Sequence, residues 1–337
     1  MAAIVLLRDR GGIVDNGGAT ASREIAAVQE TQGLVEALYR SLSQPQRDEI
    51  LFEWDHVDRE RGLLRAFIAN HWQVTRPCIR GEFFTHAQQR LIHDIFTSLV
   101  DPAWYPRFLK QLKDDTKGHE WGADQSVALF GDPERGPLQF VITGRHLTLR
   151  SEANGDGRVA LGGPILYGHQ ATGFYERPNH PGNVFWEQAL QASELAAMLD
   201  EAQLATAVVD ALPAETQISF DGNRPGISVA ALAEPQRAQL ARTLAVLLEP
   251  FGAAERAQLM ECISRQGGLD RCHLAFARDG RMSAPHWDNW RLEGPSLVWH
   301  FRGFPHVHVW VHAASDASVP VNARRGTFIF PEHDPLR

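Results

Sequence analysis

Cysteine is scarce in this sequence of 337 residues: only Cys78, Cys262 and Cys272 are present, far apart along the chain. Three cysteines at this spacing exclude both a disulfide framework and a Cys-x-x-Cys zinc site. If the protein binds a metal ion, its ligands must therefore be nitrogen and oxygen atoms.

Excess positive charge and long apolar segments are also missing. The chain has 33 Lys and Arg against 41 Asp and Glu, a net charge of −8, so it lacks the basic field that attracts nucleic acid or an anionic membrane. No apolar run approaches the roughly 20 residues of a transmembrane helix, and Ile4–Leu7 is too short for a secretory signal. We therefore expect a cytoplasmic protein with neither a nucleic-acid partner nor a membrane partner.

The hydrophobic content of 44% is that of a globular protein with a full core. Helical patterns cover residues 22–42, 43–54, 85–99 and 104–112, and Thr85–Gln88 forms a capping box at the start of the third. Alternating, strand-like patterns follow, the last of them over residues 158–167, and the same order of helices and then strands repeats. This layout predicts an α+β fold in which a mainly antiparallel sheet, from strands at about 126–167 and 272–312, has helical segments packed outside it. We expect a flexible arm at residues 1–20 and one domain at 21–337, with a helical part at 21–115, sheet parts at 125–167 and 272–312, and a helical insertion at 190–263.

The most informative stretch is His306–His312, which alternates strictly between two kinds of residue. Successive side chains of a strand point to opposite faces, so the valines at 307, 309 and 311 should face a core. The other face should carry His306, His308, Trp310 and His312. Imidazoles two residues apart on a strand lie about 6–7 Å apart at Cα, close enough to share one metal ion.

Two further histidines are candidate ligands on neighbouring strands. His146 precedes Leu147-Thr148-Leu149, which alternates like a strand. His300 ends a strand that a short connection joins to His306. A three-residue connection, with Pro305 in the loop, would pair Arg302 with His306 and place His300 opposite His308 on the same face, whereas a two-residue connection would send His300 to the other face.

We therefore expect one transition-metal ion at His146, His300, His306 and His308. Imidazoles without thiolates suit copper or iron, our preference, and zinc is the third choice. The residues expected around a small-molecule substrate, anionic or aromatic, are Arg145, Arg150, Arg302, Trp299 and Trp310. Solvated arginines and an aromatic packing layer are the alternative interpretation of these side chains.

The order of several short motifs resembles the bacterial DUF3500 family, whose function is unknown. The resemblance covers most of residues 45–312, and its motifs are Gln46-Arg47-Asp48, the helix Thr85–Leu99, Phe140-x-x-x-Gly144-x-His146-Leu147-Thr148-Leu149, Leu199-Asp200-x-x-Gln203, Leu232-x-x-x-Gln236-x-x-x-Leu240, His273-x-x-Phe276, Gly294-Pro295-Ser296 and His306-x-His308. The resemblance implies that His146, His306 and His308 match recurring histidines of the family. It implies no reaction.

The function expected from these residues is a metal-dependent enzyme, with an oxidoreductase favoured because no carboxylate that could act as a general base stands beside the histidines in the sequence. A metal-dependent hydrolase and a non-enzymatic protein that binds a metal or another ligand are the alternatives. The oligomeric state does not follow from the sequence.

Overall fold

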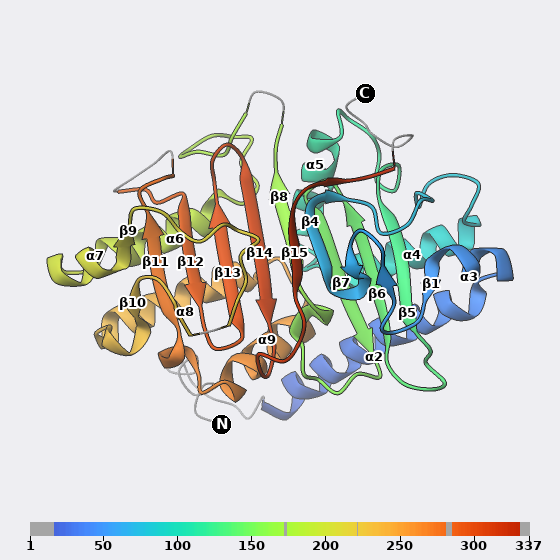
Figure 1. Cartoon of the computed structure of the whole chain (residues 1–337), viewed down its shortest axis with the longest axis horizontal. Helices are drawn as coiled ribbons and strands as arrows, with labels where there is room; N and C mark the ends of the chain where they lie inside the picture. Colours follow the sequence, from blue (N-terminus) through green and yellow to red (C-terminus); the bar gives the residue numbers. More distant parts are fainter. Residues whose placement is uncertain (1–16, 172–173, 221, 281–284, 331–337) are drawn as a thin grey trace.

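One large sheet forms the centre of the molecule (Figure 1). The computed structural model describes residues 17–171, 174–220, 222–280 and 285–330. The strand order is β1 Leu51–Phe52, β5 Ser126–Gly131, β6 Leu138–Gly144, β7 Leu147–Ala153, β8 Ile165–His169, β14 Val307–Ala313, β13 Leu297–Arg302, β12 Asn289–Glu293, β11 His273–Ala277 and β10 Ile227–Ser228, with β9 Val208–Val209 beside β11. The strand pairs are antiparallel except β1–β5 and β9–β11, which are parallel, so the sheet is mixed but mostly antiparallel.

The pairing of β8 with β14 joins the two halves of this sheet. β14 lies antiparallel to β8 with Val309 opposite Tyr167 and Val311 opposite Ile165. The expectation that strands from 126–167 and 272–312 form one sheet is therefore confirmed, and this pairing brings residues about 140 positions apart in the sequence to neighbouring strands.

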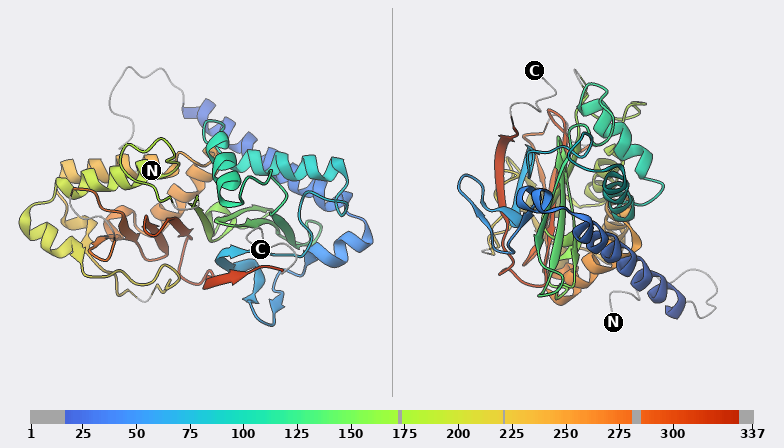
Figure 2. Two further views of the ribbon diagram at one scale, coloured as in Figure 1. Left: turned by 90° about the horizontal axis from the view of Figure 1, so that it is seen from above. Right: turned by 90° about the vertical axis from the view of Figure 1, so that its right-hand side faces the viewer.

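Helices cover one face of the sheet (Figure 2). The valines of β14 belong to that face and are fully buried in the main core, together with the apolar sides of the helices. The helices are α2 Gly17–Ser41, α3 Gln44–Ile50, α4 His86–Leu99, α5 Tyr105–Asp115, α6 Trp186–Ala197, α7 Glu201–Ala207, α8 Glu234–Leu248 and α9 Ala253–Arg265. The capping box that predicts the start of α4 is present, since Thr85 Oγ1 accepts from the Gln88 amide at 3.2 Å and Gln88 Oε1 accepts from the Thr85 amide at 2.9 Å.

The opposite face of the sheet is covered by extended chain rather than by helices. Two parallel strands, β4 Phe67–Trp72 and β15 Asn322–Phe328, form a second layer there. Residues 210–220, which we call the crossing segment, run over the same face across β12, β13 and β14 (Figure 1). Helical segments therefore lie outside only one face, because the other face carries His308, Arg291 and Arg302, whose polar groups need partners.

Three local expectations differ from the structure. The helix expected over residues 43–54 ends at Ile50, where the chain becomes strand β1, and the helical part at 21–115 also contains β4 and the hairpin β2 Val57–Asp58 with β3 Gly62–Leu63. The strand expected over residues 158–167 begins only at Ile165. The two glycines Gly162 and Gly163 have φ values of 65° and 133°, which interrupt the extended conformation.

The flexible arm was expected at residues 1–20. Residues 1–16 lie outside the described part of the chain, and residues 17–20 form the first turn of α2. None of the helices in the described ranges is long and apolar enough to cross a membrane.

The second layer is fixed to the sheet by a buried hydrogen bond that can be tested. Trp72 Nε1 of β4 donates to Thr148 Oγ1 of β7 at 2.8 Å, and both residues are fully buried. Thr148→Val keeps the shape but leaves the indole N–H without an acceptor, so we expect a loss of about 1–3 kcal/mol in the free energy of unfolding. Urea denaturation measures it, and the exposed Thr206→Val is the control, with a change within about 0.5 kcal/mol.

Candidate metal centre

The connection between β13 and β14 places two of the candidate histidines. Arg302 pairs with His308, and His300 pairs with Trp310. The expected pairing of Arg302 with His306 is therefore wrong by two residues, because the connection takes up His306 and Val307 as well as Gly303–Pro305. A register shift of two residues leaves every side chain on the same face of the sheet. His300 is therefore on the same face as His308, but it lies opposite Trp310, two residues beyond His308 along β14.

His146 occupies the tight turn between β6 and β7. Gly144 pairs with Leu147, which leaves Arg145 and His146 as the two turn residues. The φ of His146 is 49°, a left-handed conformation that costs an ordinary residue about 1 kcal/mol and favours Gly or Asn. A histidine with this backbone conformation indicates that its side chain is needed there.

Gly168 allows the turn and β14 to approach each other. Gly168 lies opposite His308 in the β8–β14 pair. A Cβ atom at residue 168 would lie 2.2 Å from the Val307 carbonyl oxygen and 3.3 Å from the Cβ of His146. Only glycine fits there without displacing the backbone, so this glycine is required for His146 and His308 to meet.

The three imidazoles of His146, His306 and His308 form one cluster. One ring nitrogen from each of these histidines lies within 4.8 Å of the others, and the ring centroids are 4.5–4.8 Å apart. The Nε2 atoms of His306 and His308 are 2.8 Å apart. Two facing nitrogens at that distance repel each other unless a proton or a metal ion lies between them. We call this cluster the histidine triad.

A buried carboxylate orients His146. Asp115, the last residue of α5, is 3% exposed, and its Oδ2 lies 2.6 Å from His146 Nδ1. The same carboxylate accepts from Gln111 Nε2 at 2.9 Å and from the Gln170 amide at 2.6 Å. With Nδ1 bonded to Asp115, the Nε2 atom of His146 is the one left to bind a metal.

A second buried carboxylate orients His308, and it comes from the crossing segment. The two oxygens of Glu215 lie 3.0 and 3.1 Å from His308 Nδ1. Asn70 Nδ2 donates to Glu215 at 2.8 Å and Arg302 Nε donates to it at 2.8 Å. Asn70 and Arg302 also contact Nδ1, but an ionised Glu215 favours the tautomer in which Nδ1 donates to it, which leaves Nε2 free.

The electrostatics of the cluster favour neutral imidazoles, the form that binds metals. Burial lowers the pKa of His146, His306 and His308. The neighbouring imidazoles lower the pKa of His146 and His306 further, whereas Glu215 partly opposes the effect of burial on His308. Burial alone would raise the pKa of Glu215, but His308 and the Arg302 guanidinium hold it well below its usual range. Burial raises the pKa of Asp115 to about 7.

The fourth expected ligand, His300, does not belong to the triad. It is buried, its Nδ1 lies 3.5 Å from Arg291 Nη1, and burial lowers its pKa to about 3. The reason is the register of β13 and β14, which places Trp310 rather than His308 directly opposite His300.

The expected substrate residues divide into two groups. Arg150 is buried, and its three guanidinium nitrogens donate to the carbonyls of Arg65, Phe67 and Pro164. Trp299 points into the helix-covered core, on the face opposite to His308, and Trp310 packs against Ile68 and Leu166. These three side chains are taken up by contacts within the protein, while Arg302 is paired with Glu215 and Arg145 lies in the turn beside His146.

Asp115 and Glu215 are the residues of the candidate site that sequence reasoning missed. Asp115 stands at the end of a helix next to another aspartate, and Glu215 stands in a loop, so neither has a local pattern that distinguishes it from a surface carboxylate. Their contacts with the triad depend on pairs of residues 31 and 93 positions apart.

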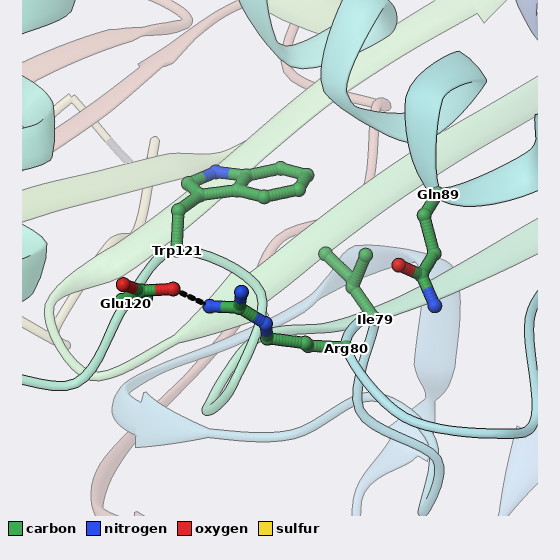
Figure 3. A pocket seen from close by; sticks show the side chains of 5 residues that line it. All are labelled: Ile79, Arg80, Gln89, Glu120 and Trp121. Carbon is green, nitrogen blue, oxygen red and sulfur yellow. Dashed lines mark hydrogen bonds and ion pairs between the residues drawn. The ribbon is translucent and has the colours of Figure 1, made fainter. Parts of the chain in front are cut away.

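A separate surface pocket lies away from these residues, between α4 and the loop before β5 (Figure 3). Its cavity of about 260 Å³ is lined by Ile79, Arg80, Gln89, Glu120 and Trp121. Arg80 and Glu120 already form an ion pair on its rim. The volume is at the lower end for small-molecule sites, so we assign no ligand to it.

Comparison with known families gives one match. Residues 24–315 match the sequence profile of a family described as "Protein of unknown function (DUF3500)". The chain belongs to the DUF3500 family. No curated protein and no solved structure matches the chain, so the activity must be argued from the histidine triad itself.

A buried imidazole next to the triad in this DUF3500 protein fixes the loop that supplies Gln170. His169 Nδ1 lies 2.7 Å from Glu176 Oε1, and its Nε2 lies 3.0 Å from Asp114 Oδ2. Glu176 also accepts from the amides of Val184 and Phe185, just before α6. Burial alone would lower the pKa of His169, but the carboxylate of Glu176 raises it above 6.5. The ring of His169 therefore connects β8 with α5 and with the start of α6 through its two carboxylate partners.

This contact predicts a pH-dependent stability. A histidine whose pKa is raised in the folded state contributes its full stabilisation at pH values below the unfolded pKa of 6.5. This contribution is lost as the pH rises through the folded pKa. His169→Gln should therefore lower the free energy of unfolding by about 2 kcal/mol at acid pH and by less in alkaline solution. Urea denaturation of the unmodified protein and of His169→Gln, at pH values from acid to alkaline, measures the difference in the free energy of unfolding. His119→Gln, which alters a more exposed histidine–aspartate pair, should show little effect, and a pH-independent loss in His169→Gln would contradict the assignment.

Proposed function

We propose that this protein is a mononuclear metal-dependent enzyme in which His146, His306 and His308 bind one transition-metal ion through Nε2. An oxidoreductase that uses copper or iron on a small organic substrate is the reaction class we favour. The histidine triad, with Nδ1 of two of its members fixed by Asp115 and Glu215, is the observation that carries the proposal.

The carboxylate contacts support metal binding rather than chance proximity. Histidines that bind metals usually donate their other ring N–H to a carboxylate or carbonyl, which fixes the tautomer and increases the basicity of the ligand. Two of the three members of the triad have this arrangement, and each carboxylate is buried and bonded to further donors. Burying two carboxylates costs free energy, which a role in metal binding would explain.

The number of ligands supports a catalytic site over a storage or structural site. Structural sites are closed by four protein ligands, whereas catalytic sites have three and an open position. Within the described ranges, no fourth His, Cys, Asp or Glu joins the triad. His306 is only partly buried, whereas His146 and His308 are buried, so His306 is the member of the triad nearest to solvent.

The two carboxylates that contact the triad also favour redox chemistry. Asp115 and Glu215 are each bonded to a ligand imidazole and to other donors, so neither is free to act as the general base of a hydrolase. Three imidazoles suit copper or iron, and either metal would supply one-electron chemistry. A zinc hydrolase is the second candidate, because three neutral ligands leave the full charge of the ion to lower the pKa of a bound water.

Metal analysis tests the proposal most simply. Protein purified without chelator should contain about one metal ion per chain, and His146→Asn, His306→Ala and His308→Ala should each lose it. Asn is chosen at residue 146 because it tolerates the left-handed backbone. His300→Asn is the matched control and should keep the metal.

The identity of the metal decides between the two reaction classes. Copper or iron supports the oxidoreductase, and zinc supports the hydrolase. Protein that neither contains nor takes up a stoichiometric metal ion would refute both.

Asp115→Asn and Glu215→Gln test the role of the carboxylates separately. Each variant keeps the shape of the side chain but weakens the hydrogen bond to a ligand imidazole, so we expect a metal affinity about 10- to 100-fold lower. Competition with a chromophoric chelator measures the affinity. Glu187→Gln, on an exposed carboxylate paired with Arg107, should leave the affinity unchanged, and equal affinities in all three variants would contradict the role.

A further inference from the structure

Several charged groups around the triad are already paired within the protein. Glu215 is paired with Arg302, and the carboxylates of Asp114 and Glu176 contact His169, with Lys110 also paired to Asp114. Asp115 contacts His146, and Arg145 precedes His146 in the turn. A divalent ion on three neutral imidazoles would retain its charge of +2, which favours the binding of an anion from outside the protein.

Arg145 is placed to share such an anion with the metal. It precedes His146 in the β6–β7 turn, and its Nη2 donates to Gln170 Oε1 at 2.8 Å. Gln170 in turn donates its backbone amide to Asp115 at 2.6 Å, so Gln170 links the guanidinium to the carboxylate that contacts His146.

The guanidinium of Arg145 has unused hydrogen-bonding capacity. Its Nε is buried and has no hydrogen-bond partner among the described residues. A buried donor without an acceptor is unfavourable, and a bound ligand with an acceptor oxygen would supply the missing hydrogen bond. Arg302, the other arginine at the triad, cannot take this role, because Glu215 and the Phe304 carbonyl accept from it.

We propose that the substrate of this site is a small organic carboxylate, which binds the metal at its open side and is paired with Arg145. This inference rests on the proposed metal site and adds the chemical class of its ligand. A planar carboxylate has two oxygens, so one can bind the metal while the other accepts from the guanidinium. Arg145 is then a substrate-binding residue and not a metal ligand.

The test uses the full chain loaded with Co²⁺, whose visible spectrum reports changes at the metal. Acetate should change the spectrum in a saturable way, and acetamide, a neutral molecule of the same shape, should not. Arg145→Gln should bind Co²⁺ with unchanged stoichiometry but bind acetate about 10- to 100-fold more weakly. Arg135→Gln is the matched control, since it removes the same charge at the opposite end of β6, where Arg135 lies in an exposed turn.

The outcomes separate this inference from the proposed function. If the protein takes up no Co²⁺, the metal site fails and the inference fails with it. If Co²⁺ binds but acetate does not change the spectrum, or if Arg145→Gln binds acetate as tightly as the unmodified protein, only the inference is overturned. Tighter binding of inorganic phosphate than of acetate would overturn the choice of a carboxylate.

Discussion

The antiparallel pairing of β8 with β14 is the contact on which the candidate site depends. It joins two halves of the sheet that are far apart in the sequence, and its register places Gly168 opposite His308. Because Gly168 has no Cβ, the β6–β7 turn can approach β14 closely enough for His146 to reach His306 and His308. A one-residue slip of this register would send His308 to the helix-covered face and separate the triad.

The two faces of the sheet differ in composition and in role. One face is apolar and packs against helices, which supplies the hydrophobic burial that stabilises the fold. The other face carries buried polar side chains. Strands β4 and β15 and the crossing segment cover these side chains, and the crossing segment forms hydrogen bonds with them. The crossing segment contributes Glu215, so the cover of this face is also part of the triad's environment. The covering of this face and the geometry of the triad therefore depend on the same layer of the structure.

The sequence predicted the part of the site that depends on local periodicity. Alternation in His306–His312 correctly separated the valines from His308, Trp310 and His312, and the capping box at Thr85 correctly located the start of α4. The triad of His146, His306 and His308 was contained in the predicted set, as was the joining of the two halves of the sheet. The strand faces and the helix start follow from side-chain direction along a strand and from hydrogen bonds between near neighbours in sequence, whereas the joining of the two halves was inferred from the order of the elements.

The rest required the tertiary structure. The length of a hairpin connection does not follow from its residues alone, so the register that removes His300 from the triad was predicted two residues out. Asp115 and Glu215 contact the triad through pairings across 31 and 93 residues, for which no local pattern exists. The second layer of β4 and β15 was missed because the strand-like run at residues 326–330 does not show that this segment pairs in parallel with residues 67–72.

The most direct measurement of the central claim is anomalous diffraction from a crystal of the metal-loaded protein, collected at the absorption edge of that metal. The account predicts one peak at bonding distance, about 2.0–2.1 Å, from Nε2 of His146, His306 and His308, with Nδ1 of His146 and His308 still bonded to Asp115 and Glu215. A stoichiometric metal at any other position, or no metal at the triad in a crystal grown with excess metal, would contradict it.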